Sequence, residues 1–279
     1  SGASGALRAS GATGAVGSVG TAGATGAGAG ASGAFRASAP APVSGSVSGS
    51  GSATAEPPST AAPTVGWGSA DLGTPTTLVL LRHGETALTP QKRFSGSGGS
   101  DPSLSEAGRR QAEAVATALA ARGTIQAIVS SPLARCRETA EAVAARLGLD
   151  VRIDKGLRET DFGAWEGLTF AEAQERYPDE LASWLASPKA APPGGESFAA
   201  VTRRVSAARD RLLAAEAGRT VLVVTHVTPV KTLVRLALGA PPDSLFKMEL
   251  SAASLSAVAY YADGNASLRL LNDTSALRA

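Results

Sequence analysis

Two apolar runs, each ending in a histidine, constrain the fold of this chain more than any other feature. Leu78–Leu81 leads into Arg82 and His83, and the β-branched run Val221–Thr225 leads into His226. Runs of this kind predict buried strands of a sheet that is covered on both faces. In such sheets, ligands bind in the crevice outside the carboxyl ends of the strands. Because the chain has only two histidines, two strands that each end in one predict a single shared site.

Strand-like and helix-like segments alternate along the part of the chain that contains both histidines. Further strands are expected at 125–129 and 151–153, with edge strands at 255–261 and 268–271. The capping box Ser103-Leu104-Ser105-Glu106 is expected to open a helix that ends near Arg122. This alternation predicts an α/β fold, a three-layer α/β/α sandwich with a mostly parallel central sheet. The remaining helices are expected at 135–147, 169–186, 197–217 and 228–238.

The first 74 residues differ in composition from the rest of the chain. They consist almost entirely of Ala, Gly, Ser, Thr and Pro and hold more than half of the 32 glycines. Such a segment buries too little apolar surface to offset its conformational entropy, so we predict a disordered linker over 1–74. One domain is predicted over 75–279. Because the chain starts at Ser1 and its one methionine is Met248, we expect a longer protein with another domain before the linker.

Composition and charge exclude several classes of function for this domain. The net charge of +2 and the lack of a basic block argue against nucleic-acid binding. No apolar run is long enough to cross a membrane, and no signal peptide is recognisable. The single cysteine, Cys136, excludes an internal disulfide and fits a reducing, cytoplasmic compartment. Two histidines and one cysteine far apart in sequence make a poor zinc-ligand set, so no metal site is expected.

The residues that follow the predicted strands suit a phosphoryl group. Arg82 and His83 supply a guanidinium fork and an imidazole. Arg135 follows Ser130-Ser131-Pro132 and lies in the first turn of a predicted helix, where the free N–H groups also favour an anion. Glu159 lies on a loop and is a carboxyl that could protonate a leaving alkoxide. The pattern predicts a phosphate-handling site.

Each of these residues also has a simpler structural interpretation. A lone histidine after a strand is usually a buried structural residue, and a lone arginine is usually solvated. Cys136 is interpreted as a small residue on a helix face, because neighbouring arginines alone do not establish a reactive thiol. The combination favours function, because all the candidates follow predicted strands or lie in the loops between them.

Four segments together resemble the histidine phosphatase superfamily, which is phosphoglycerate mutase-like in fold. The resemblance covers about 76–271, and the segments occur in the family's order. They are Leu80-Leu81-Arg82-His83-Gly84-Glu85-Thr86, Ser130-Ser131-Pro132-Leu133-Ala134-Arg135-Cys136-Arg137-Glu138-Thr139-Ala140, Glu159 with Phe162-Gly163-Ala164-Trp165-Glu166-Gly167, and Thr225-His226.

The resemblance implies a role for each candidate. His83 would be the nucleophile and would become a phosphohistidine, for which its ring must be neutral and held in one tautomer. Arg82, Arg135 and His226 would hold the phosphoryl oxygens. Glu159 would protonate the leaving oxygen and then activate water. Neither a metal nor a cofactor would be required.

The chain departs from the family pattern around the pocket. Thr89 stands where the family often has an asparagine that binds phosphate. Ser95 and Gly96 match the family and would touch phosphate, whereas Val227 replaces a common glycine after the second histidine. These departures leave the substrate open. The aromatic residues Phe94, Trp165, Phe170 and Trp184 could line the pocket, but the core is the favoured place for each.

Among members of the family, a phosphomonoester hydrolase of the bacterial acid phosphatase type is expected. Phosphoglycerate mutases carry a longer insertion after the acidic residue, so mutase chemistry is the less favoured alternative. An α-ribazole-phosphate phosphatase of cobalamin synthesis and a catalytically silent phosphate-binding module are two further alternatives. The long linker resembles that of actinobacterial bifunctional proteins, which implies a preceding RNase H domain that would bind an RNA/DNA hybrid.

Overall fold

The computed structural model describes residues 73–278. Apart from its last two residues, the predicted linker over 1–74 lies outside this range, so its disorder stays a prediction. Within the described part, no helix is both long and apolar enough to cross a bilayer.

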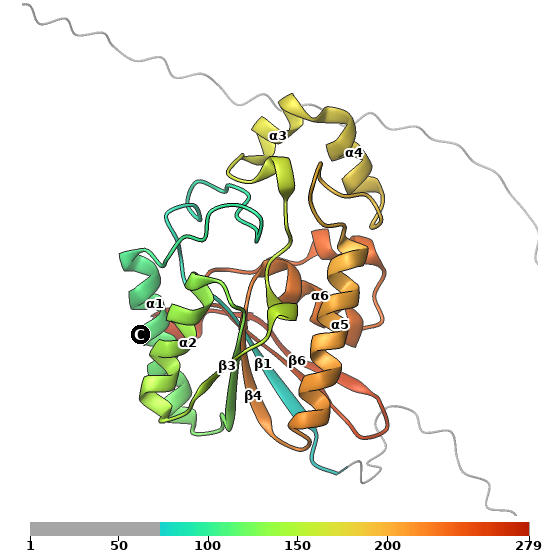
Figure 1. Ribbon diagram of the computed structural model, residues 1–279. Helices are drawn as coiled ribbons and strands as arrows, with labels where there is room; N and C mark the ends of the chain where they lie inside the picture. Colours follow the sequence, from blue (N-terminus) through green and yellow to red (C-terminus); the bar gives the residue numbers. More distant parts are fainter. Residues whose placement is uncertain (1–72, 279) are drawn as a thin grey trace, which may run out of the picture. The chain divides into compact units, whose positions relative to one another are not determined.

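The described residues form six strands and six α-helices in the expected alternating order (Figure 1). Short 3-10 turns over 155–157, 163–165, 242–247 and 275–278 join or follow them. The strands are β1 (Thr76–Arg82), β2 (Ala127–Ser130), β3 (Val151–Ile153), β4 (Thr220–Thr225), β5 (Leu255–Tyr260) and β6 (Ala266–Asp273). The helices are α1 (Glu106–Arg122), α2 (Ala134–Leu147), α3 (Phe170–Arg176), α4 (Pro178–Ala186), α5 (Phe198–Ala215) and α6 (Val227–Ala237).

The strands make one sheet in the order β3-β2-β4-β1-β5-β6. Strands β1 to β4 run parallel, while β5 and β6 are antiparallel to their neighbours. The prediction of a mostly parallel sheet is therefore confirmed. Strand β5 was expected at an edge, but it pairs with β1 on one side and β6 on the other. Its residues are almost all buried, which a strand with neighbours on both sides explains.

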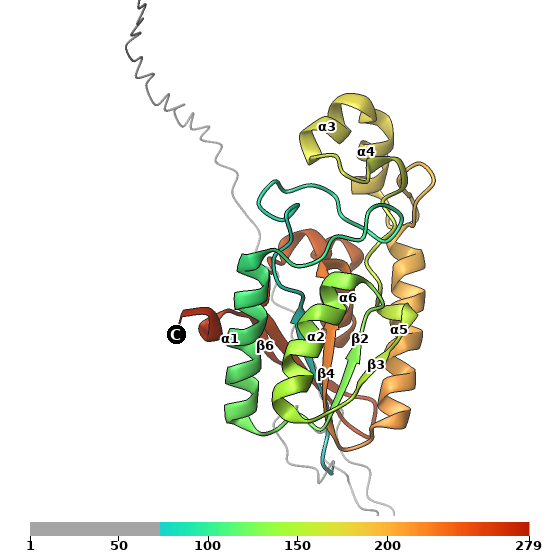
Figure 2. The same ribbon diagram turned by 60° about the vertical axis from the view of Figure 1, so that its left-hand side comes forward.

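Helices cover both faces of the sheet, as the three-layer prediction requires (Figures 1 and 2). On one face, Leu78 and Leu80 of β1 pack in a core with Val201 and Val205 of α5 and with residues of α6. On the other face, Leu81 packs with residues of α1 and α2. The alternation of side chains along β1 thus supplies both cores. The carboxyl ends of the parallel strands, where the histidines lie, are left open at one end of the sandwich.

Helix α1 begins later than the predicted capping box requires. The N-cap is Ser105, whose side chain accepts a hydrogen bond from the Gly108 amide, and the helix starts at Glu106. Leu104 is still extended, because it forms an antiparallel bridge with Thr86. The residue before the helix is therefore held by the loop that follows β1. The box predicted over 103–106 was wrong by two residues.

A small lid lies beyond the carboxyl ends of the strands (Figure 1). The single helix predicted over 169–186 is two helices, α3 and α4, separated at Tyr177 just before Pro178. Proline disfavours helical backbone in the residue that precedes it, which explains the break. Aromatic residues form the core of this lid, and Trp165 and Trp184 pack edge to face with ring centroids 5.5 Å apart.

Candidate active site

The two histidines meet at the carboxyl end of the sheet. His83 directly follows β1, and His226 follows β4 as the N-cap residue of α6. Because β1 and β4 are parallel neighbours, with Arg82 opposite Thr225, the next residue of each strand lies at the same edge. The ring centroids of His83 and His226 are 5.1 Å apart. The expectation that two strands deliver both histidines to one place is confirmed.

The imidazole of His83 has one nitrogen engaged and one free. Its Nδ1 lies 2.7 Å from the carbonyl oxygen of Gly84, which can only accept, so Nδ1 carries the proton and donates. Burial lowers the pKa of His83 well below its ordinary value, and the charges of Arg135 and Arg82 lower it further. The ring is therefore neutral at neutral pH, and its lone pair is on Nε2. The neighbour that fixes the tautomer is the next backbone carbonyl.

Gly84 also explains how the chain turns away from the sheet after His83. A Cβ on Gly84 would lie 2.5 Å from the carbonyl oxygen of Gly108 in α1. Only glycine allows the loop to pass this close to the helix. The Gly84 amide donates to the hydroxyl of Thr139 in α2, 3.1 Å away. The loop that carries the His83 acceptor is thus held between two helices.

Arg135 is a fully buried cation with unused donors. It lies in the first turn of α2, as predicted, and its side chain is 1% exposed. One terminal nitrogen donates to the carbonyls of Ser95 and Gly96, at 2.9 and 3.2 Å. Its Nε and its other terminal nitrogen have no hydrogen-bond partner, and the nearest carboxylate oxygen, on Asp101, is 3.6 Å away. A buried guanidinium with free donors favours an anionic ligand beside it.

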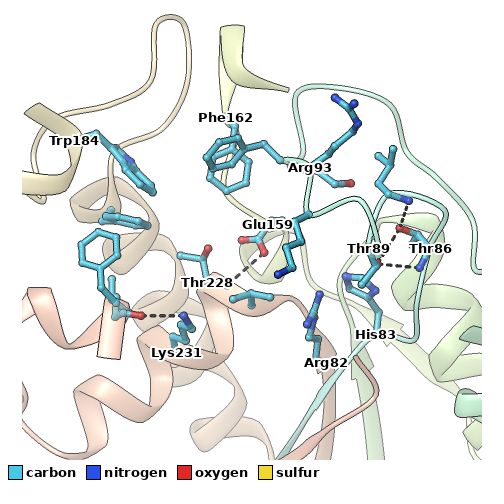
Figure 3. Close-up of a pocket in the computed structure, with 18 residues that line it drawn as sticks. Arg82, His83, Thr86, Thr89, Arg93, Glu159, Phe162, Trp184, Thr228 and Lys231 are labelled. Atoms are coloured by element: carbon cyan, nitrogen blue, oxygen red, sulfur yellow. Dashed lines mark hydrogen bonds between the residues drawn. The ribbon is translucent and has the colours of Figure 1, made fainter. Parts of the chain in front are cut away.

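Arg82 ends β1 and lines the cavity above the sheet (Figure 3). One of its terminal nitrogens donates to the carbonyl of Leu250, 2.6 Å away, and its buried Nε has no partner. Burial lowers the pKa of this guanidinium, and the charge of Glu159 opposes that change. Together with Arg135, it concentrates positive charge around His83.

Glu159 lies on the loop between β3 and the lid and faces the same cavity (Figure 3). Its carboxylate accepts from the amide of Thr160 at 2.8 Å and from the amide of Thr228 at 3.3 Å. Its side chain is almost fully buried. Arg204 of α5 donates to the backbone carbonyls of Arg158 and Glu159, at 2.7 and 3.0 Å, and so fixes this loop. One backbone amide of its own loop and one of α6 therefore hold this carboxylate in place.

His226 is fully buried and does not line the cavity. Its Nε2 lies 2.7 Å from the hydroxyl of Ser131 and 3.3 Å from the sulfur of Cys136. Burial lowers the pKa of His226 well below its ordinary value, as do Arg135 and His83. Burial also raises the pKa of the Cys136 thiol, so this sulfur is not a thiolate. Cys136 is thus a buried helix residue, as interpreted from the sequence.

The remaining predicted phosphate contacts divide into two kinds. Thr89 and Ser95 line the cavity, and the Thr89 hydroxyl accepts from the amide of Thr86 at 3.0 Å. Gly96 does not line it, because its amide donates to the Glu166 carboxylate at 2.8 Å. A Cβ on Gly96 would lie 2.1 Å from the carbonyl oxygen of Thr160. Close packing of the loop therefore explains this glycine without a phosphate contact.

The cavity has a volume of about 420 Å³ and extends from His83 to the aromatic lid. Of the aromatic residues considered from the sequence, Phe94 and Trp184 line it, whereas Trp165 is buried in the lid core. The core was favoured for Phe170 as well, but this residue is exposed on the surface, so that expectation was wrong. Sequence reasoning missed several lining residues, including Lys231, which lies three residues after Thr228 on one face of α6. Thr228 and Lys231 lie three residues apart just after the end of β4, and this helical spacing could have identified both as residues that face the cavity. The other lining residues that the sequence did not single out are Leu88, Lys92, Phe198, Leu245 and Phe246.

Among the described residues, no group of three or more His, Cys, Asp or Glu side chains is arranged to hold a metal ion. Arg82 and Arg135 place positive charge beside His83.

Comparison with known proteins agrees with this site. Residues 78–274 match the model of the histidine phosphatase superfamily, branch 1. A bifunctional protein of Mycobacterium tuberculosis is 55% identical over 212 residues, which are 76% of this chain and 57% of that protein. The chain therefore spans little more than half the length of this relative. Phosphoserine phosphatase 1 of Hydrogenobacter thermophilus is 34% identical, with 65% of this chain and 85% of that protein aligned.

Solved structures have the same fold. A mycobacterial glucosyl-3-phosphoglycerate phosphatase in complex with VO3 superposes with a TM-score of 0.65 and is 33% identical. The match covers 71% of this chain and all of that one. The chain belongs to branch 1 of the histidine phosphatase superfamily, a family that includes phosphomonoester hydrolases.

Proposed function

We propose that this domain hydrolyses phosphomonoesters through a phosphohistidine on His83, without a metal ion or other cofactor. One observation carries the proposal: a neutral, buried histidine with a free Nε2 lies beside two arginines that have unused donors. A phosphoryl group needs a nucleophile in line and positive charge around its oxygens. Arg82 supplies that charge from the cavity lining and Arg135 from behind it. The family resemblance makes His226 a further phosphate ligand, although its buried ring does not line the cavity in this structure.

In the first step, Nε2 of His83 attacks phosphorus and the bond from phosphorus to the ester oxygen breaks. Glu159 in its acid form gives its proton to the leaving oxygen, and the alcohol departs. In the second step, the Glu159 carboxylate takes a proton from water, and the water oxygen attacks phosphorus. The bond between phosphorus and Nε2 then breaks, which releases phosphate and restores His83. Thr89 and Ser95 line the cavity and supply hydroxyl contacts to the phosphate.

The low pKa of His83 supports activity of the acid phosphatase type. A ring whose pKa is well below its ordinary value stays neutral, and hence nucleophilic, in mildly acidic solution. The assignment of Glu159 as the acid rests on its place in the cavity and on the family resemblance.

We also propose that the domain is one half of a larger cytoplasmic protein. The mycobacterial relative is described as bifunctional and is longer than this chain. A phosphatase joined to a second activity fits a bifunctional protein, and the resemblance of the linker to that of actinobacterial bifunctional proteins implies an RNase H domain as the second half. That half, and not this domain, would bind nucleic acid.

Phosphate release from a panel of phosphomonoesters, measured in the presence of a chelator from acid to neutral pH, tests the proposal. The wild-type protein should turn over, and His83→Ala should lose turnover while its thermal unfolding remains cooperative. Rapid quenching in base with phosphate-labelled substrate should trap label on the wild-type protein, and later acidification should release it. Turnover that persists in His83→Ala would overturn the mechanism. Transfer of phosphate between two positions of a glycerate would instead support a mutase. If no ester reacts, a silent phosphate-binding module would be supported.

A further inference from the structure

The cavity has a second cationic group beyond the proposed phosphate site. Lys231 lies on α6, one helical turn after Val227, and lines the cavity together with His83 and Arg82. In Figure 3 it lies on the cavity floor, with Arg82 between it and His83. Phe198, Leu245 and Phe246 line the cavity as well, so this end is largely apolar.

The charge of Lys231 is poorly compensated in the free protein. Its Nζ donates to the carbonyl of Leu245, 2.9 Å away. No carboxylate oxygen of the described residues lies within 4.0 Å of Nζ. Burial lowers the pKa of Lys231, and Arg82 lowers it further, whereas the more distant charges of Glu159 and Glu249 oppose the change. An ammonium has three donors, so two remain for a ligand.

The other cations that line the cavity are placed differently. Arg93 forms an ion pair with Glu172 at 2.9 Å and donates to the carbonyl of Gly167 at 2.7 Å. Lys92 is exposed to solvent. Arg82 belongs to the phosphate end. Lys231 is therefore a half-buried cation of the cavity that has no ion pair within the described residues and is not needed to bind the phosphate.

We propose that Lys231 binds a second anionic group of the substrate, a carboxylate a few bonds from the phosphate ester. This inference rests on the proposed phosphatase function and names its substrate class. Two free donors on one ammonium match the two oxygens of a carboxylate. A second phosphate is less suited, because the first phosphate end uses two arginines and this end offers one cation. The largely apolar surroundings strengthen a charge pair, because less water screens it there.

A pair of esters that differ only in the carboxylate tests the proposal. Phosphoserine and phosphoethanolamine form one such pair, and 3-phosphoglycerate and glycerol 3-phosphate form a second. Steady-state kcat/KM is measured for the wild-type protein, Lys231→Met and Lys231→Arg. The methionine variant should lose roughly tenfold more on the carboxylated ester than on its partner, mainly in KM, as for one charge-assisted hydrogen bond. The arginine variant should recover part of the preference.

Lys247→Met is the matched control, because it removes the same charge from an exposed lysine outside the cavity lining. It should change both esters of a pair alike. Turnover of p-nitrophenyl phosphate that depends on His83 distinguishes a failure of the carboxylate site from a failure of the proposed phosphatase function. If that turnover is present but Lys231→Met affects both esters equally, or if neither carboxylated ester is accepted, the carboxylate site is wrong and the phosphatase stands. If no ester is hydrolysed, the proposed function itself fails.

Discussion

Glu166 should control phosphate binding although it does not line the cavity. Its carboxylate accepts from the amides of Gly96 and Phe162, at 2.8 and 3.0 Å, and from the amide of Gly98 at 3.4 Å. The carbonyls of Ser95 and Gly96 in turn accept from Arg135. The contacts therefore run from Glu166 through one loop to a buried arginine. Loss of the carboxylate should loosen that loop and, with it, Arg135.

The expected size of the effect follows from these contacts. In Glu166→Gln, one side-chain oxygen can still accept, but the amide nitrogen faces a backbone N–H that needs an acceptor. At least one charge-assisted hydrogen bond is lost, which costs about 2 kcal/mol. If the whole loss falls on the loop that holds Arg135, affinity for phosphate weakens by up to roughly 30-fold.

Competitive inhibition by inorganic phosphate measures this change directly, and thermal unfolding shows whether the rest of the domain is intact. Glu175→Gln is the control, since it removes the same charge from an exposed position on α3. We expect a weaker phosphate Ki for Glu166→Gln and an unchanged one for the control. A wild-type Ki in a folded Glu166→Gln protein would refute the argument that this loop positions Arg135.

Two further predictions concern the acid and the histidines. Glu159→Gln should lower turnover of alkyl phosphates by roughly 10²- to 10⁴-fold, whereas nitrophenolate leaves without a proton. With p-nitrophenyl phosphate the variant should give a burst of about one equivalent and then stall, because the same carboxylate activates water; a linear time course at the wild-type rate would count against its role. Both His83 and His226 have a pKa held below the ordinary value by burial. In the unfolded chain both imidazoles take up a proton near pH 6.5, whereas in the folded protein they remain neutral. The free energy of unfolding should therefore fall as pH drops below that value, by up to about 2.7 kcal/mol per pH unit. Urea unfolding between pH 5 and 8 measures the slope, which His83→Gln should halve; a flat profile below pH 6.5 would contradict buried neutral rings.

The sheet and the place of the site could be predicted because they depend on long-range patterns that are visible in sequence. Apolar runs that end in histidine require parallel neighbours with a common open edge, and β1 and β4 provide it. The edge position assigned to β5 failed, because its antiparallel pairing depends on which strand the chain returns to. Local patterns cannot specify that choice, because β1 is distant from β5 in sequence although β6 follows β5 closely.

Contacts of the loops were the least predictable part of the site. Gly96 matches a phosphate-binding pattern, yet its amide is bound by Glu166, a residue 70 positions away. Arg204 is one arginine on a long helix, and nothing in its neighbourhood indicates that it holds the backbone of Glu159. Such roles depend on where two loops meet, which periodicity does not encode. Lys231 is intermediate, because its helix face could be inferred but the shape of the cavity could not.

The reacting residues lie at the rigid edge of the sheet, whereas loops and the lid form the rest of the cavity. This difference explains why the reaction type is easier to infer than the substrate. His83 and His226 directly follow neighbouring strands, and Arg135 lies in the first turn of α2. Their geometry is therefore fixed by the sheet, and any chain that folds this way presents them similarly. The far wall of the cavity comes from loops and from the lid, including Phe162 and Trp184. Changes there alter which alcohol fits without moving the nucleophile, so specificity should depend on these residues and on Lys231, and the chemistry on the sheet edge.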